Sequence, residues 1–220
     1  MWKAGDELNG NLDFYVIDKS KKKGVTDTIA VYEAKDALGH VYAIKAPRSD
    51  IALYIEKKDD LDFEYEDWPI GKERFKREIN NLKELNADKE VSKGVVLLED
   101  CGIYPFPWIV MELGSQELTK VLKNSKFPKI IVDLLYKLYR IHSMRIIHGD
   151  ITPGNIMLMG GVWKFIDFDL STHNHSDKNF VGTAKYASPE KKKREHDDIE
   201  GGIKDDLYSM GLILYEGLSS

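Results

Sequence analysis

The sequence predicts an α+β fold in which a small sheet-rich lobe is followed by a mostly helical lobe. Two β-rich runs, at 29–34 and 40–45, flank a short glycine-containing turn, which is the pattern of a β-hairpin. Apolar residues at three- and four-residue steps within 130–141 share one face, which is the pattern of an amphipathic helix. Because the strand signals come first along the chain, we expect the sheet in the first lobe and the helices in the second.

Other segments complete this outline in chain order. The acidic run at 57–67 has poor periodicity and is expected to be a solvated loop. Apolar positions at helical spacing predict a helix from 71 to about 85. Short strands are predicted at 94–98, 108–111, 155–159 and 162–166. A final helix is expected to begin near Asp205 or Asp206.

These elements predict a division of the chain into two lobes. The first lobe is expected at 1–111 and the second at 116–220, with a connecting segment at 112–115. The cleft between two such lobes is a natural place for a ligand.

The composition excludes several classes of protein. With 42% hydrophobic and 31% charged residues, the chain is neither disordered nor fibrous. A net charge of −5 gives little attraction for nucleic acid or anionic membranes, so neither is an expected partner. The single cysteine, Cys101, excludes an internal disulfide framework and fits a reducing compartment. Because the sequence near Met1 lacks a signal-peptide pattern and no apolar run could span a membrane, a cytoplasmic location is expected.

The chemistry-bearing signal lies in two segments, HGDITPGN at 148–155 and KFIDFD at 164–169. Asp150 and Asn155 can converge across the Pro-Gly turn, and Asp167 ends an apolar run. Two carboxylates and an amide oxygen are hard ligands of the kind that Mg²⁺ takes alongside substrate phosphates. Either segment alone would be read as a tight loop with solvated acids. Their joint spacing and flanking strands make the pattern much more specific.

With these motifs the chain resembles the eukaryotic-type Ser/Thr protein kinase family, from about residue 24 to the C-terminus. The resemblance implies a two-lobed protein-kinase-like fold. Its first lobe is a small antiparallel sheet with one helix, and its second lobe is mostly helical and ends after the helix near Asp206. The resemblance also implies ATP and Mg²⁺ as cofactors and a protein substrate with a Ser or Thr acceptor.

The resemblance assigns catalytic roles to four residues. Lys45 matches the lysine that holds the α- and β-phosphates of ATP, and Glu78 matches the glutamate that pins this lysine. Asp150 matches the aspartate that accepts or steers the substrate hydroxyl proton. Thr183 matches the family's usual threonine in the peptide-positioning loop.

The resemblance also assigns ligands to the metal and the nucleotide. The metal ligands are expected to be Asn155 and Asp167. The nucleotide-binding residues are expected to be Gly24, Val31, Ala43, Lys45, Met111, Glu112, Leu113 and Met157.

Two later segments favour a protein substrate. The segment GTAKYASPE at 182–190 is similar to the peptide-positioning loop of Ser/Thr kinases. The segment DLYSMG at 206–211 is similar to the following helix, whose aspartate supports the catalytic loop. Small-molecule kinases of the aminoglycoside and choline type share the earlier motifs but lack this pair.

The phosphate-covering loop and the catalytic loop depart from the family pattern. The three glycine positions of the phosphate loop are Gly24, Thr26 and Ile29 here, so only the first glycine is present. Gly149 replaces the arginine that reads out phosphorylation of the activation loop. The absence of this arginine predicts activity without phosphorylation of the activation loop, although Ser171 and neighbouring residues offer phosphate acceptors.

Further departures keep two alternatives open. Thr152 replaces a lysine that neutralises the transferring phosphate, which should reduce transition-state stabilisation. Asp169 replaces a glycine of the protein-kinase pattern, and Gly149 and Asp169 together are more similar to the corresponding motif positions of small-molecule kinases. The chain ends at Ser220, so it is a reduced kinase, or a fragment, or a partner completes its second lobe. A pseudokinase that binds nucleotide as an interaction module is the other alternative, although Lys45 and the complete set of site residues argue against it.

Overall fold

The computed structural model describes residues 7–9, 14–18, 24–25, 29–47, 69–102, 107–173, 182–193 and 198–219. The chain divides into two compact units. The first is drawn from Met1–Ile79 and Leu97–Leu113, and the second from Asn80–Val96 and Gly114–Ser220. The predicted acidic loop at 57–67 and the phosphate-loop position Thr26 lie outside the described residues. The predicted lobe boundaries at 112–115 stay a prediction.

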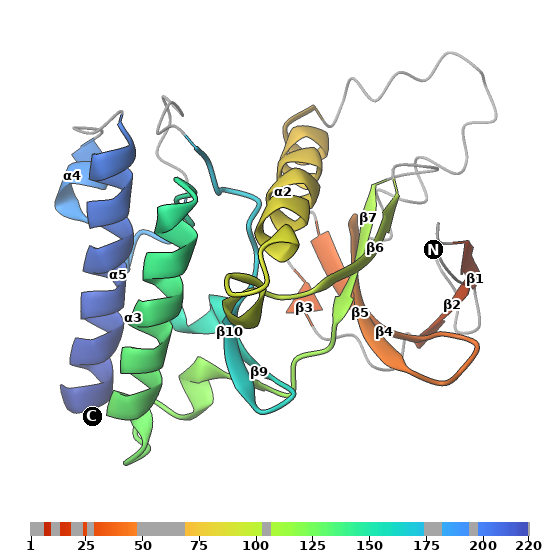
Figure 1. The fold of residues 1–220 in the computed structure, drawn as a ribbon, viewed down its shortest axis with the longest axis horizontal. Coiled ribbons are helices and arrows are strands. Elements are labelled where there is room, and N and C mark those ends of the chain that lie inside the picture. Colours follow the sequence, from red (N-terminus) through yellow and green to blue (C-terminus); the bar gives the residue numbers. More distant parts are fainter. Residues whose placement is uncertain are drawn as a thin grey trace. The chain divides into compact units, whose positions relative to one another are not determined.

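The first unit is built on one antiparallel sheet (Figure 1). Its strands are β1 (Glu7–Asn9), β2 (Phe14–Asp18), β3 (Gly24–Val25), β4 (Ile29–Lys35), β5 (Val41–Pro47), β6 (Leu98–Gly102) and β7 (Trp108–Glu112). Their order across the sheet is β1-β2-β4-β5-β7-β6, and β3 pairs with β4 off this path. The predicted hairpin is confirmed as β4 and β5, and the antiparallel sheet places the chain in the expected α+β class.

Asp36 organises the turn that joins β4 to β5. Its Oδ1 accepts hydrogen bonds from the backbone N–H groups of Leu38 (2.9 Å) and His40 (2.8 Å). Its Oδ2 accepts a hydrogen bond from the Tyr42 hydroxyl at 3.2 Å. Gly39 has a φ of +84°, a conformation that glycine adopts without steric cost. These contacts fix the register in which the two strands pair.

Alternation along β4, β5 and β7 gives the sheet two different faces. One face forms an apolar cluster of Ala30, Tyr32, Ala34, Ile44, Ala46, Trp108 and Val110. The register sets Val31 opposite Lys45 and Ala43 opposite Met111. These four side chains therefore point to the face that the apolar cluster does not use.

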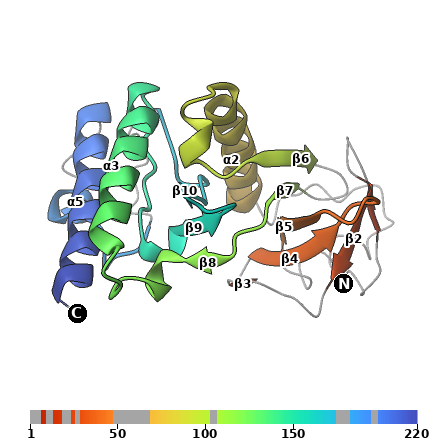
Figure 2. The same ribbon diagram turned by 60° about the horizontal axis from the view of Figure 1, so that its bottom comes forward.

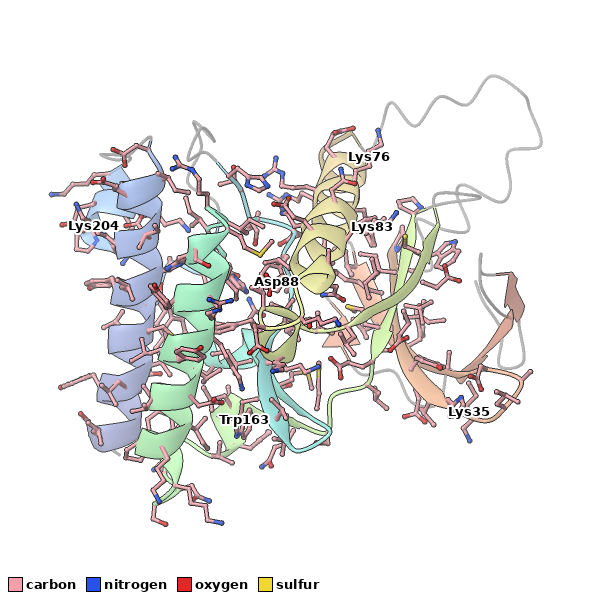
Figure 3. All side chains as sticks on the ribbon, in the orientation of Figure 1. Lys35, Lys76, Lys83, Asp88, Trp163 and Lys204 are labelled. Atoms are coloured by element: carbon pink, nitrogen blue, oxygen red, sulfur yellow. The ribbon has the colours of Figure 1, made fainter. Side chains whose placement is uncertain are left out.

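The helix α2 (Pro69–Ala87) confirms the helix predicted from 71 to about 85, with slightly wider bounds. Its predicted apolar positions are buried, namely Phe75, Ile79, Leu82 and Leu85. Asp88 follows the last residue of the helix (Figure 3). Its Oδ1 accepts hydrogen bonds from the backbone N–H groups of Glu90 (2.8 Å) and Val91 (3.0 Å), which turns the chain after the helix.

The strand predicted at 94–98 is wrong. The segment Ser92–Gly94 is a short 3₁₀ helix, η3, and β6 begins only at Leu98. Val95 makes one isolated parallel bridge, to Phe165, and is completely buried. A short buried apolar run does not by itself distinguish a strand from a buried connecting segment.

In its described residues, the second unit combines the end of α2 and three further α-helices with a small sheet. The helices are α3 (Phe127–Ser143), α4 (Pro189–Lys193) and α5 (Ile199–Ser219). The sheet has the order β10-β9-β8, from β8 (Gln116–Glu117), β9 (Ile156–Met159) and β10 (Val162–Phe165). Two further 3₁₀ helices are η4 (Leu118–Lys120) and η5 (Pro153–Asn155). The strands predicted at 155–159 and 162–166 are thus confirmed within one residue at each end.

Helices α3 and α5 lie side by side in both ribbon views (Figures 1 and 2). A Cβ atom built at Gly217 of α5 would lie 2.0 Å from Cε1 of the buried Phe127 of α3, so a larger residue would push the helices apart. In the same unit, Lys137 of α3 donates a hydrogen bond to the carbonyl oxygen of Trp163 in β10 at 2.9 Å.

Helix α5 begins at Ile199, well before the predicted start near Asp205. The carboxylate of Asp198 accepts a hydrogen bond from the backbone N–H of Gly201 at 2.7 Å, which caps the first turn. Gly201 and Gly202 are buried, and glycine weakens the sequence signal for a helix. Among the helices in the described part of the chain, none is long and apolar enough to span a membrane.

Candidate active site

In the first unit, Lys45 of β5 and Glu78 of α2 form a buried ion pair. Nζ of Lys45 lies 2.7 Å from Oε2 of Glu78, and the two side chains are 8% and 1% exposed. The Phe75 ring centroid lies 5.9 Å from the ammonium. Because water screens a buried pair only weakly, the carboxylate holds the ammonium firmly in one position. The pair therefore presents a fixed positive group on the sheet face that carries Val31 and Ala43.

The other predicted nucleotide-binding residues are divided between the units. The first unit holds Gly24, Val31, Ala43, Met111, Glu112 and Leu113. Gly24 is the register partner of Val31, which is itself opposite Lys45. In the second unit, a Cβ built at Gly114 would lie 2.6 Å from Cε of Met157, so the methionine side chain lies directly against the backbone there. Nucleotide binding by these residues stays a prediction.

In the second unit, Asp206 of α5 holds the start of the catalytic loop. Its Oδ2 accepts a hydrogen bond from the backbone N–H of His148 (2.8 Å), and its Oδ1 accepts one from that of Gly149 (3.0 Å). Nε2 of His142 lies 2.9 Å from Oδ2. Burial alone would raise the pKa of the Asp206 carboxyl, but the hydrogen bond and charge of His142 hold this pKa below its ordinary value.

His148 has a structural role in this unit. Its side chain is completely buried, and its ring centroid lies 4.7 Å from that of Phe168. Nε2 lies 3.0 Å from the carbonyl oxygen of Ile166, while Nδ1 accepts a hydrogen bond from the backbone N–H of Asp150 at 3.3 Å. These partners assign the proton of a neutral ring to Nε2. Because both ring nitrogens are occupied within the fold, His148 is not available as a general base.

The segment after Asp167 packs against the catalytic loop. Asn81 of α2 donates to the carbonyl oxygens of Phe168 (3.3 Å) and Ser171 (2.9 Å). The Ser171 hydroxyl is completely buried and donates to the carbonyl of His148 at 2.8 Å. Ser171, which the sequence offers as a phosphate acceptor, is therefore inaccessible in this conformation.

Asp150 lies at the centre of a hydrogen-bonded cluster in the second unit. Its Oδ1 accepts a hydrogen bond from the backbone N–H of Thr183 at 2.7 Å. Its Oδ2 accepts hydrogen bonds from the Thr183 hydroxyl (3.3 Å) and from Nδ2 of Asn155 (3.2 Å). The carboxylate is thus placed where an alcohol hydroxyl can donate to it. This is the geometry that a proton acceptor for an alcohol requires.

Asn155 and Asp167 are close in the structure because the backbone N–H of Ile166 donates to the carbonyl of Asn155 at 3.0 Å. Nδ2 of Asn155 also donates to the carbonyl of Asp150 at 2.9 Å. These bonds use Nδ2 of the amide, so Oδ1 is the side-chain atom of Asn155 that could accept a metal ion. Asp167 adopts the left-handed conformation, with a φ of +66°, just after the end of β10.

This donor set fits magnesium that is bound together with a nucleotide. Within the described residues, no group of three or more His, Cys, Asp or Glu side chains is arranged to hold a metal ion. Mg²⁺ in phosphate-transferring sites usually takes only one or two carboxylates and completes its shell with phosphate oxygens and water. One carboxylate and one amide oxygen match that requirement.

The loop at 183–188 is tied to α5. Ser209 donates to the carbonyl of Tyr186 at 2.9 Å, and the Tyr186 hydroxyl donates to Oε2 of Glu216 at 2.8 Å. Lys185 also pairs with Glu216, and its hydrogen bond lowers the pKa of the Glu216 carboxyl below its ordinary value. Ser188 is hydrogen-bonded to Asp205 of the same helix. These contacts fix the backbone of the loop that delivers Thr183 to Asp150.

Gly149 occupies a position that suits only glycine. Its φ is +83°, and a Cβ built on it would lie 2.9 Å from the carbonyl oxygen of Leu170. An arginine, as found in the family pattern, would require Leu170 to move. The departure from that pattern therefore has a steric reason in this chain.

Replacing Gly149 by alanine should destabilise the protein by about 1–3 kcal/mol, because it combines backbone strain with a contact to Leu170. Gly161 provides a matched control, since its φ is +84° and a Cβ there would have nothing within 4 Å. The free energy of unfolding, measured with denaturant, should fall more for Gly149→Ala than for Gly161→Ala. Equal losses would mean that the Leu170 contact contributes nothing.

Sequence reasoning missed two residues that support the site. Asn81 was visible as a signal, because it lies three positions after Glu78 and four before Leu85, on the buried face of α2. It is 5% exposed, and a polar residue on such a face needs a partner. His142 offered no comparable signal, because its partner Asp206 is distant in the sequence.

Comparison with known proteins agrees with this geometry. Residues 24–220 match the family described as protein kinase domain. A probable serine/threonine-protein kinase PknB of Bifidobacterium longum is 32% identical over 202 residues, which cover 83% of this chain and 27% of that protein. The dual specificity protein kinase Ttk of Danio rerio is 28% identical over 202 residues, covering 84% of this chain and 19% of that protein. Serine/threonine-protein kinase PknB of Mycobacterium leprae is 30% identical over 160 residues, covering 66% of this chain and 25% of that protein. The chain thus spans 19–27% of the length of these relatives.

Proposed function

Because this chain belongs to the protein kinase family, we propose that it transfers the γ-phosphate of ATP to serine or threonine hydroxyls of a protein, with Mg²⁺ as cofactor. In this reaction the hydroxyl oxygen of the acceptor attacks the γ-phosphorus, and the bond to ADP breaks. Asp150 accepts the proton of the hydroxyl. Asn155 and Asp167 would hold a magnesium ion, which would supply positive charge to offset the negative charge that develops on the phosphate oxygens.

The observation that carries the proposal is the position of Asp150. Its carboxylate already accepts a hydrogen bond from the hydroxyl of Thr183, at 3.3 Å. An acceptor hydroxyl of similar chemistry can donate to the same carboxylate. The amide of Asn155 donates to Oδ2 as well, which fixes the orientation of the carboxylate.

The Lys45–Glu78 pair supports the same chemistry in the first unit. The ammonium of Lys45 lies 2.7 Å from the carboxylate of Glu78, and the Lys45 side chain is 8% exposed. The ion pair therefore holds the ammonium in one position. We assign it to the α- and β-phosphates of ATP. Asn155 and Asp167 are assigned to the magnesium ion, since their donor chemistry suits an ion that brings phosphate ligands with it.

The proposal is tested by incubating the protein with ATP, Mg²⁺ and a generic acceptor protein, and by identifying the modified residue by mass spectrometry. Phosphoserine or phosphothreonine is expected on the acceptor or on the chain itself. Removal of Mg²⁺ by a chelator should abolish the transfer, and Asp167→Ala should do the same while the protein remains folded. Full activity of Asp167→Ala would show that the metal ligand is misassigned.

Parallel reactions separate the alternatives. Aminoglycoside, sugar and choline acceptors are included because Gly149 and Asp169 are closer to the small-molecule kinases. Turnover of such an acceptor without protein phosphorylation would replace the proposed activity. A thermal shift with ATP and Mg²⁺ but no transfer to any acceptor would identify a nucleotide-binding pseudokinase.

A further inference from the structure

The catalytic loop has no cation of its own. Residues 149–155 contain neither lysine nor arginine, and Thr152 stands where the resemblance leads one to expect a lysine. Thr152 is buried, and its hydroxyl oxygen accepts a hydrogen bond from the backbone N–H of Asn155 at 3.2 Å. It therefore caps η5 and contributes no positive charge. Phosphoryl transfer develops negative charge close to Asp150, and stabilising this charge requires a positive group.

Lys191 of α4 brings an ammonium to the same loop. Its Nζ is hydrogen-bonded to the carbonyl oxygen of Gly149, the residue before Asp150. The backbone N–H of Lys191 donates to the hydroxyl oxygen of Ser188 at 2.8 Å. Ser188 is itself held by Asp205 of α5, so the position of Lys191 is set by the fold rather than by a free side chain.

Gly182 gives a second, independent indication of this proximity. A Cβ atom built on it would lie 3.2 Å from Oδ1 of Asp150 and 3.6 Å from Nζ of Lys191. The aspartate oxygen and the ammonium thus both border one point of the backbone. Glycine, with a φ of +125°, leaves that point open.

In the part of the chain that the structure describes, the Lys191 ammonium is bound to a carbonyl oxygen and to no carboxylate. Within the described residues Lys191 takes part in no ion pair, whereas Lys185 in the preceding loop is paired with Glu216. A half-buried ammonium without a carboxylate partner is available to an anion that arrives at Asp150.

We infer that Lys191 contacts the transferring phosphoryl group and stabilises its charge, in the role that a lysine at position 152 would otherwise have. This inference rests on the proposed phosphoryl transfer. The ammonium of Lys191 donates hydrogen bonds to phosphoryl oxygens, while Asp150 accepts the hydroxyl proton. Catalysis in this chain then depends on a residue that follows the peptide-positioning loop.

The test compares four variants with the wild-type chain in the phosphotransfer assay. Lys191→Met should lower kcat by about 10²-fold and change the KM for ATP little, because the lost interaction belongs to the transition state. Lys192→Met removes the same charge from the exposed neighbour and should leave kcat unchanged. Lys191→Arg and the double variant Thr152→Lys with Lys191→Met restore a cation, and at least one of them should recover most of the lost kcat. Thermal unfolding checks that each variant folds.

Two results would overturn the inference. The first is a kcat of Lys191→Met equal to that of the wild type. The second is a fall in kcat that neither Lys191→Arg nor the double variant recovers, because this would mean that Lys191 only packs α4 in place. Binding of Mg²⁺–ADP–fluoroaluminate, a mimic of the transferring phosphoryl group, provides a readout that does not need turnover. Lys191→Met should weaken binding of Mg²⁺–ADP–fluoroaluminate more than binding of Mg²⁺–ADP. If the ratio of these two affinities is the same in wild type and variant, Lys191 does not contact the phosphoryl group. A wild-type chain without transfer activity would instead overturn the proposed function.

Discussion

Replacing Asp150 by asparagine should lower the rate of phosphoryl transfer by about 10³-fold and leave the fold intact. The carboxylate receives hydrogen bonds from the backbone and hydroxyl of Thr183, and an amide in its place is a far weaker proton acceptor. The loss should appear in kcat, because the role proposed for Asp150 is at the reacting hydroxyl rather than in nucleotide binding. Steady-state kinetics with saturating ATP measure it directly.

Asp133 gives a matched control for this substitution. It is an exposed acid of α3 that forms an ion pair with Lys137 of the same helix, at 2.5 Å. Asp133→Asn makes the same chemical change away from the site and should leave kcat unchanged. The thermal shift produced by ATP and Mg²⁺ should persist in Asp150→Asn. If Asp150→Asn kept wild-type activity, Asp150 would not be the proton acceptor of the reaction.

Replacing Asp206 by alanine should destabilise the protein by about 3–5 kcal/mol, because it leaves the buried N–H of His148 and the half-buried N–H of Gly149 without an acceptor. Asp206→Asn keeps one acceptor oxygen and should have an intermediate effect. Lys204→Ala, at an exposed position of the same helix (Figure 3), should change stability little. Denaturant unfolding of the three variants gives these differences. Equal stabilities of Asp206→Ala and Lys204→Ala would mean that the catalytic loop is held by other contacts.

The contribution of Asp206 should depend on pH in a definite direction. The pKa of its carboxyl is lowered in the folded protein, since the hydrogen bond and charge of His142 outweigh the effect of burial. A lowered pKa adds stability above the unfolded-state pKa of about 3.9, and this stability is lost as the pH falls through the folded value. The difference in the free energy of unfolding between wild type and Asp206→Asn should therefore be full at neutral pH and shrink below about pH 4.

Local patterns in the sequence predicted the elements whose burial follows a simple period. The hairpin of β4 and β5, helix α2 and helix α3 were predicted for this reason. Strand β2 carries aromatic and β-branched residues at 14–18, so its signal was present but was not used. The start of α5 and the segment at 94–98 were misjudged. In the first case buried glycines weakened the helix signal, and in the second a buried connection imitated a strand.

The candidate site was predicted as a set of residue types, but its contacts were not. The family resemblance identified Lys45 and Glu78, whereas their separation of 2.7 Å and their burial come only from the fold. Gly149 looked like a simple loss of an arginine until its φ and its approach to Leu170 gave a steric reason. Lys191 is not among the site residues predicted from the sequence, because its hydrogen bond to Gly149 joins residues 42 positions apart.

The two faces of the sheet in the first unit also decide which changes in length the chain tolerates. Ala43 and Lys45 lie on the same face of the sheet because one residue separates them, and successive side chains of a strand point to opposite faces. A single residue inserted within β5, just after Ala43, would turn Lys45 toward the apolar cluster. Residues added to the turn after β4 would leave both faces unchanged. Length variation is therefore tolerated in that turn, and within the strand only in even steps.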